Sequence, residues 1–105
     1  MIDNPDEVNE LMREMASCLP IPVRPSSQLE RYMKQKGVQL PGQLNIKAIF
    51  YHGDEGGILC DVTASESPNA LIVSITHLWL STSHPLGNKI RAYQKKRKEQ
   101  LRLEH

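Results

Sequence analysis

The chain has 105 residues, of which 39% are hydrophobic and 24% are charged, and its formal net charge is +1. This length predicts one domain with a single modest core, and the composition excludes a disordered chain. A net charge this small gives no global electrostatic argument for binding nucleic acid or a membrane.

The two ends of the chain bear on its location. The N-terminus is acidic where a signal peptide needs basic residues, and no apolar run approaches transmembrane length. We therefore expect a cytoplasmic protein that does not enter a membrane. We assign residues 1–102 to a single small domain, because Leu103-Glu104-His105 resembles the remnant of a vector-encoded tag.

The two cysteines, Cys18 and Cys60, lie far apart and do not form a CxxC pair. Cys18 falls on a predicted helix and Cys60 in a predicted strand. Both are therefore expected to be buried thiols rather than partners in a disulfide, and burial should raise the pKa of Cys60.

The first helix has a clear start. Asn4 can cap it, Pro5 suits its first position, and Glu7 can complete a capping box. The residues that follow place apolar side chains at helical spacing, namely Val8, Leu11, Met12, Met15 and Leu19. This pattern predicts an amphipathic helix with one face in the core.

A proline-rich segment, residues 20–25, separates the first helix from a second. Its prolines remove backbone donors and favour extended neighbours, so we expect a stiff strap across the core. Ser27 with Glu30 offers a capping box for the second helix, and Gly37 is a plausible C-cap residue.

Three β-rich runs follow, at residues 44–52, 58–63 and 70–80, with turn residues between them. This order predicts an antiparallel meander. The alternation predicts one buried face that is formed by Phe50, Cys60, Val73 and Ile75. The third run is apolar in both phases, which favours helices on one side of the sheet and a partner on the other.

The last predicted helix follows residues 81–85 and has Pro85 at its first position. Ile90, Tyr93 and Leu101 lie near one face of this helix, and Arg97 interrupts that face. The complete order predicts an α+β fold, α-α-β-β-β-α: a three-stranded antiparallel meander with two N-terminal helices and one C-terminal helix.

One end of the meander is a candidate metal site. With a tight turn centred on Asp54-Glu55, we expect His52 to lie opposite Ile58. This hairpin geometry brings His52 and His77 close to Asp54 and Glu55, and His84 follows a few residues later. Imidazoles and carboxylates that converge in this way can bind a divalent metal or transfer protons. The alternative is structural: the glycines of residues 53–57 serve the turn, and the carboxylates at its tip are solvated.

The basic C-terminal helix is a candidate nucleic-acid surface. Its cations can neutralise phosphates, and Tyr93 could stack on a base. The candidate residues are Lys89, Arg91, Lys95, Lys96 and Lys98. The alternatives are solvation of this face and charge pairing with the acidic first helix, within the chain or between two copies.

The sequence thus supports three hypotheses about function. The first is a non-enzymatic binding or protein-interaction module without a cofactor, whose partner is a second copy or another protein. The second is a nucleic-acid-binding accessory protein that uses the basic helix. The third is a small metal-dependent enzyme at the His52/His77 end of the sheet.

Overall fold

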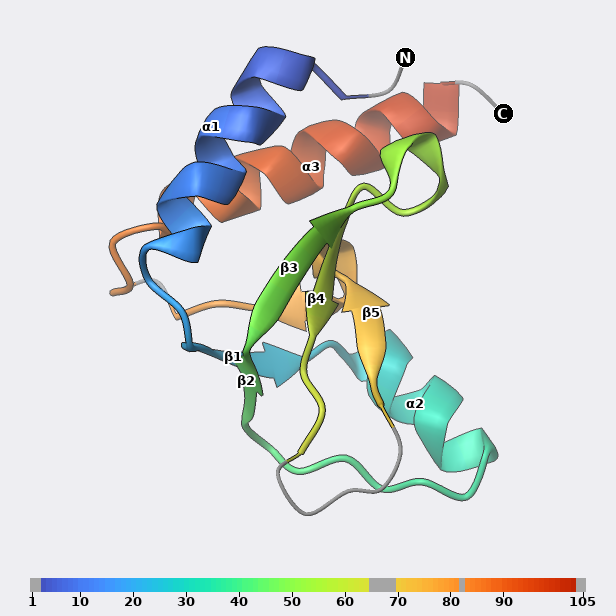
Figure 1. The fold of residues 1–105 in the computed structure, drawn as a ribbon. Coiled ribbons are helices and arrows are strands. Elements are labelled where there is room, and N and C mark those ends of the chain that lie inside the picture. The colour runs from blue at the N-terminus through green and yellow to red at the C-terminus, as the bar shows by residue number, and fades with distance from the viewer. Residues whose placement is uncertain (1–2, 65–69, 82, 104–105) are drawn as a thin grey trace.

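The computed structural model describes residues 3–64, 70–81 and 83–103, which form an α+β fold (Figure 1). Its α-helices are α1 (Pro5–Ala16), α2 (Ser27–Gln35) and α3 (Gly87–Leu103). Its strands are β1 (Ile21–Pro25), β2 (Leu44–Ile46), β3 (Ala48–Tyr51), β4 (Ile58–Asp61), β5 (Ile72–Ser74) and β6 (Leu78–Trp79), and its 3-10 helices are η1 (Gly53–Glu55) and η2 (Ile75–His77). The predicted α+β class is confirmed, although the chain has more strands than the predicted order.

Two antiparallel sheets, with strand orders β2-β1-β6 and β3-β4-β5, replace the single predicted meander. The first predicted run is divided between the two sheets, because residues 44–46 form β2 and residues 48–51 form β3. The second run forms β4, and the third begins as β5 and continues through η2 into β6 of the other sheet. Most of the predicted loop at residues 64–69 lies outside the described residues, as do residues 104 and 105 of the predicted tag remnant.

The cap of α1 is the predicted one. The Asn4 side chain accepts hydrogen bonds from the backbone N–H groups of Asp6 at 3.0 Å and Glu7 at 3.2 Å. Pro5 occupies the first helical position, where a missing N–H has no cost. The Glu7 carboxylate binds Lys96 of α3 at 2.9 Å instead of closing a capping box.

The proline-rich segment is a strand, β1, rather than a strap without partners. It lies at the centre of its sheet, where Ile21–Val23 pair with β2 and Arg24–Pro25 pair with β6. Among the described strands, Pro22 is paired only with β2 and Pro25 only with β6, so the sheet tolerates their missing donors. Ile21, Val23 and Pro25 alternate towards the core, as the burial pattern of a half-buried strand requires.

The second helix starts one residue earlier than predicted, because Ser26 rather than Ser27 is its cap. The Ser26 hydroxyl accepts a hydrogen bond from the backbone N–H of Leu29 at 3.2 Å. Ser26 is extended, as a cap must be, whereas Ser27 already has helical geometry. Gly37 follows the last turn with a φ of 82°, which is the left-handed geometry that favours glycine there.

The predicted hairpin between β3 and β4 is present, but its register differs by one residue from the predicted one. Tyr51 pairs with Ile58, and the N–H of His52 donates to the Gly57 carbonyl at 2.9 Å. The sequence pattern predicts His52 opposite Ile58 instead. Because side chains alternate along a strand, this shift moves Phe50 to the opposite face, where it is 47% exposed.

The predicted buried face is therefore wrong for Phe50 and right for two of its other members. Cys60 and Ile75 are buried, and Val73 packs against the core while remaining partly exposed. Ile49 is the residue of β3 that packs against the core, since it pairs with Cys60.

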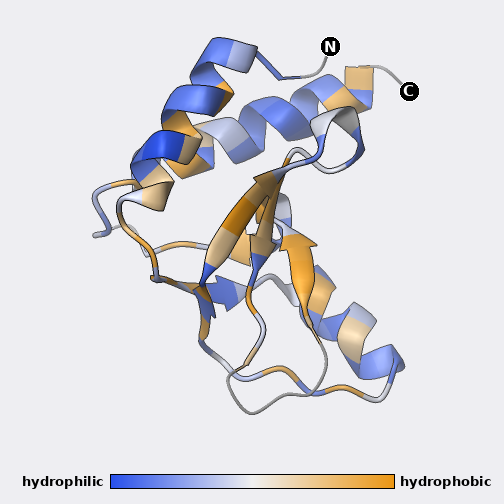
Figure 2. Cartoon of the chain, viewed as in Figure 1, coloured by the Kyte–Doolittle hydropathy of each residue, from blue (hydrophilic) through white to orange (hydrophobic). Residues whose placement is uncertain are grey.

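The core lies between the sheets and the helices α1 and α3, which run side by side (Figure 1). Figure 2 shows that β3, β4 and β5 are mostly hydrophobic, whereas the outer faces of α1 and α3 are mostly hydrophilic. The last helix begins at Gly87 rather than at Pro85, and Thr82 before it lies outside the described residues. No helix in the described part of the chain is both long and apolar enough to cross a membrane.

Candidate functional site

An open groove of about 690 Å³ lies between α2 and the sheet β3-β4-β5. Its apolar lining comes from Leu29 and Tyr32 of α2 and from Leu59 and Ile72 of the sheet. Leu29 is buried, whereas Tyr32 and Ile72 are exposed. An apolar groove that stays open to solvent is a typical site for a partner.

Strand alternation places the sheet residues of the groove. Cys60 pairs with Val73 and faces the core, so Leu59 and its partner Ser74 point to the opposite face. Ile72 lies two residues from Ser74 and shares that face. The groove is thus the outer face of the same strands whose inner face forms the core.

The other wall of the groove is fixed by a contact between the start of α2 and η2. The backbone N–H of Ser26, the cap of α2, donates to the carbonyl of His77 at 2.8 Å. This bond and the cap itself hold α2 against the segment that joins the two sheets. Leu29 and Tyr32, three residues apart, then project from the same side of α2 into the groove.

One end of the groove is polar. The Ser74 hydroxyl donates to the Gly56 carbonyl at 2.8 Å and lies 3.0 Å from the Thr76 hydroxyl. Glu55 and His77 line the same groove. Partial burial of the imidazole, with a smaller contribution from the nearby Lys98, lowers the pKa of His77, so its neutral form is favoured.

The predicted metal residues are only partly brought together. Glu55 and His77 line one groove, but His52, which follows β3 with an exposed side chain, is not part of that lining. The side chain of Asp54 lies outside the described part of the structure. Among the described residues, no three His, Cys, Asp or Glu side chains gather closely enough to hold a metal ion. A metal site that includes Asp54 stays a prediction.

His84, the third histidine of that hypothesis, has a structural contact instead. Its Nδ1 accepts a hydrogen bond from the backbone N–H of Leu86 at 3.0 Å. The bond satisfies a donor just before α3 begins, as capping side chains do at helix starts.

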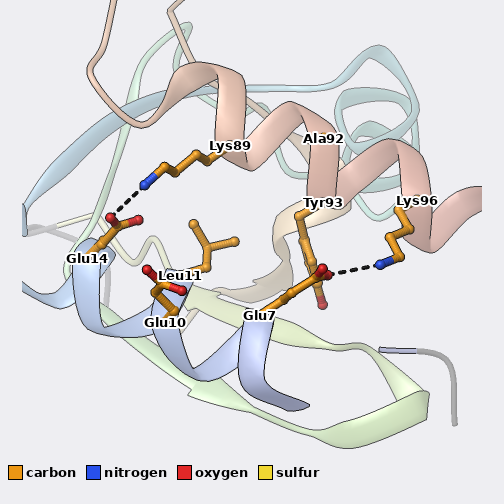
Figure 3. A pocket seen from close by; sticks show the side chains of 8 residues that line it. All are labelled: Glu7, Glu10, Leu11, Glu14, Lys89, Ala92, Tyr93 and Lys96. Atoms are coloured by element: carbon orange, nitrogen blue, oxygen red, sulfur yellow. Dashed lines mark hydrogen bonds and ion pairs between the residues drawn. The ribbon is translucent and has the colours of Figure 1, made fainter. Parts of the chain in front are cut away.

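The basic residues of α3 face different surroundings. Lys89 binds Glu14 at 2.7 Å and Lys96 binds Glu7 at 2.9 Å, both across a hollow between α1 and α3 (Figure 3). The bond to Glu14 raises the pKa of Lys89. These two ion pairs correspond to the alternative in which basic residues of the last helix pair with the acidic first helix within one chain. Arg91, Lys95 and Lys98 make no ion pair with α1 among the described contacts, and their role in binding nucleic acid stays a prediction.

A buried polar network closes the top of the fold, and the sequence reasoning missed it. The Asp3 carboxylate accepts hydrogen bonds from Arg97 at 2.8 Å, Tyr51 at 2.9 Å and Tyr93 at 3.1 Å. The Tyr93 hydroxyl also accepts from the backbone N–H of Ile58 at 3.3 Å. Burial and the Asp3 charge raise the pKa of Tyr93, which keeps its hydroxyl protonated as a donor. The signal in the sequence was Arg97, a cation on an otherwise apolar helical face.

Comparison of the chain with protein-family models, with curated proteins and with solved structures gives no significant match. Any function must therefore be argued from the groove and from the charged surfaces themselves.

Proposed function

We propose that the protein is a non-enzymatic protein-interaction module that acts as a homodimer joined through β5. One observation carries this proposal: β5 is an edge strand that presents exposed apolar surface. Ile72 of β5 is 49% exposed, and among the described strands β5 pairs with β4 alone. Beside it lies the groove, whose far wall carries the exposed ring of Tyr32.

The contrast with β6 supports a partner at this edge. The Leu78 carbonyl of β6 accepts a hydrogen bond from Gln94 of α3 at 2.7 Å, and the Leu80 carbonyl, just beyond, accepts one from Arg91 at 3.3 Å. Gln94 also donates to the carbonyl of Ile75, directly after β5, at 2.7 Å, but among the described contacts no α3 side chain bonds to the backbone of Ile72–Ser74. Folded proteins protect edge strands in such ways, or with lysine and proline. β5 reads Ile72-Val73-Ser74 and carries neither of these residues. An unprotected apolar edge is therefore the most favourable place for a further strand.

A second copy of the chain fits this edge. Two β5 strands can pair antiparallel about a two-fold axis, because each supplies the same edge that the other needs. The pairing would join the sheets β3-β4-β5 of two copies into one continuous sheet. Ile72 and Tyr32 would then be shielded by the groove residues of the partner copy.

Size-exclusion chromatography with light scattering tests the proposal on the whole chain. We expect a dimer at micromolar concentration, and we expect Ile72→Lys to convert it to a monomer by placing a charge at the joined edges. Val38→Lys is the matched control, since Val38 is 43% exposed but lies outside the groove lining. A wild-type chain that stays monomeric at several hundred micromolar would contradict the dimer and would favour an extended segment of another protein at the same edge.

A further inference from the structure

The cations of α3 fall into separate groups on the helix surface. Lys89 and Lys96 face α1 and are paired with its glutamates, and Arg97 is buried against Asp3. The other cations are Arg91, Lys95, Lys98 and Arg102, which we call the basic stripe. Lys89, Lys96 and Arg97 are neutralised within the fold, so an external anion is attracted mainly by the basic stripe.

The basic stripe has a compact geometry. Its members are spaced by four, three and four residues, so at about 100° per residue they lie within an arc of roughly 60°. The stripe is about 16 Å long at a rise of about 1.5 Å per residue. Glu99 is the only acidic residue between residues 87 and 103. The stripe is therefore a row of positive charges on a helix that carries a single acidic residue.

The stripe runs beside the segment that contains η2 and β6. Arg91 donates to the Leu80 carbonyl at 3.3 Å, and Gln94, next to Lys95, donates to the Leu78 carbonyl at 2.7 Å. Lys98 lies close enough to His77 to influence its charge. These three contacts, in register along α3, place the stripe beside the backbone of the strand that carries Trp79.

Trp79 is the only tryptophan of the chain and is 69% exposed. It pairs across the strands with Arg24, which is also exposed, and both line a hollow of about 500 Å³ on the outer face of the sheet β2-β1-β6. No acidic residue occurs in residues 20–25 or 70–81. A large aromatic ring so open to solvent has no part in the core and is available for stacking.

We propose that the basic stripe and Trp79 together bind single-stranded nucleic acid. The stripe would contact the phosphates of the strand, while a base would stack on the Trp79 ring with Arg24 beside it. A single strand fits better than a duplex, because the bases of a duplex are already stacked on each other and do not offer a free face. The surface lies on α3 and β6 and leaves β5 free, so this binding is independent of the proposed dimer.

Matched double variants of α3 test the role of the stripe. Binding of a fluorescent single-stranded oligonucleotide is measured by anisotropy at several salt concentrations. We expect Lys95→Gln/Lys98→Gln to weaken binding about tenfold or more and to lower the salt slope by roughly 1.4, or about 0.7 per lost phosphate contact. Lys89→Gln/Lys96→Gln removes the same charge from the same helix and should weaken binding far less. Equal losses in both doubles, or no binding by wild type at low salt, would overturn the proposal.

Trp79 provides a direct readout of stacking. Since it is the only tryptophan, quenching of the intrinsic fluorescence on oligonucleotide addition reports contact with this residue. We expect clear quenching, and we expect Trp79→Ala to weaken binding roughly tenfold while circular dichroism confirms its fold. Unchanged fluorescence or wild-type affinity of Trp79→Ala would overturn the stacking role. Equal affinity for a duplex of the same length, or for vesicles rich in phosphatidylserine, would contradict the assignment to single strands.

Discussion

The Asp3 carboxylate, just before α1, binds the guanidinium of Arg97 in α3 at 2.8 Å, and only 2% of each side chain is exposed. Tyr51 of β3 and Tyr93 of α3 donate to the same carboxylate. This one group therefore joins the entry to α1, the hairpin and α3. One carboxylate oxygen of Asp3 accepts hydrogen bonds from all three side chains. A buried charge requires hydrogen bonding of this kind to compensate for its lost hydration.

Asp3→Ala should lower the free energy of unfolding by about 3–5 kcal/mol, because it leaves the Arg97 charge buried without its partner. Urea denaturation measures this loss. Asp6→Ala is the control, since Asp6 is an exposed acid in the first turn of α1 and should cost about 1 kcal/mol or less. Equal effects of the two changes would show that Asp3 is not paired inside the fold.

Two glycines of the hairpin turn give a matched comparison. Gly53 and Gly57 both have a φ of 65°, so alanine should cost about 1–2 kcal/mol at either position from backbone geometry alone. A Cβ at Gly53 would meet nothing within 4 Å, whereas a Cβ at Gly57 would overlap the Tyr93 hydroxyl and lie 2.9 Å from the Arg97 guanidinium. Gly57→Ala should therefore be the more destabilising change in thermal unfolding, by about 1–3 kcal/mol. If the turn did not pack on α3, Gly57→Ala would be no less stable than Gly53→Ala.

The hairpin register makes a prediction that opposes the sequence pattern. Phe50→Ala should cost about 1 kcal/mol or less, because Phe50 lies on the exposed face. On the buried face that the alternation predicts, the same change would cost about 3–5 kcal/mol. Ile58→Ala, at a fully buried site of the adjacent strand, should cost about 2–5 kcal/mol. Chemical denaturation of both variants decides between the two registers, since a large loss for Phe50→Ala would restore the predicted one.

Burial raises the pKa of the Cys60 thiol from 9.0 to about 12. Below pH 9 the thiol is neutral in both folded and unfolded chains, and between pH 9 and 12 the unfolded chain ionises first. Stability should therefore fall as the pH rises through this range, and Cys60→Ala should reduce the slope of stability against pH.

At neutral pH, iodoacetamide should label the half-buried Cys18 well before Cys60. Faster labelling of Cys60 would contradict its burial.

The features that the sequence predicted correctly depend on local chemistry. Asn4 marks the start of α1 through bonds to the N–H groups of Asp6 and Glu7, and Pro5 marks it because it suits the first helical position. The glycines at 53 and 57 mark the hairpin turn through their φ angles. The cap of α2 differed by one residue because Ser26 and Ser27 are adjacent residues of the same type, and only the backbone geometry distinguishes them.

The features that the sequence missed depend on pairing between distant segments. β1 looked unlike a central strand because of Pro22 and Pro25, and only the staggered pairing with β2 and β6 explains why both are tolerated. Phe50 was placed on the wrong face because its register depends on how many residues the turn takes up.

The candidate site likewise has one part that the sequence predicts and one part that depends on contacts between distant segments. The meander pattern brought Glu55 and His77 to one end of the sheet, and both do line one groove. The opposite wall with Tyr32 could not be predicted, because it depends on the contact between Ser26 and the His77 carbonyl. A single sequence carries no local signal for a bond between residues that are so far apart.

The proposed dimer is tested most directly by hydrogen exchange of the backbone amides of β5 at high and low protein concentration. The account predicts that the amides of Ile72–Ser74 that point away from β4 are protected in concentrated solution and exchange faster on dilution, because their partner strand dissociates. The amides of β3 and β4 should be unaffected by dilution, since their pairing lies within one chain. Exchange in β5 that is equally fast at both concentrations would contradict the proposal that this strand joins two copies.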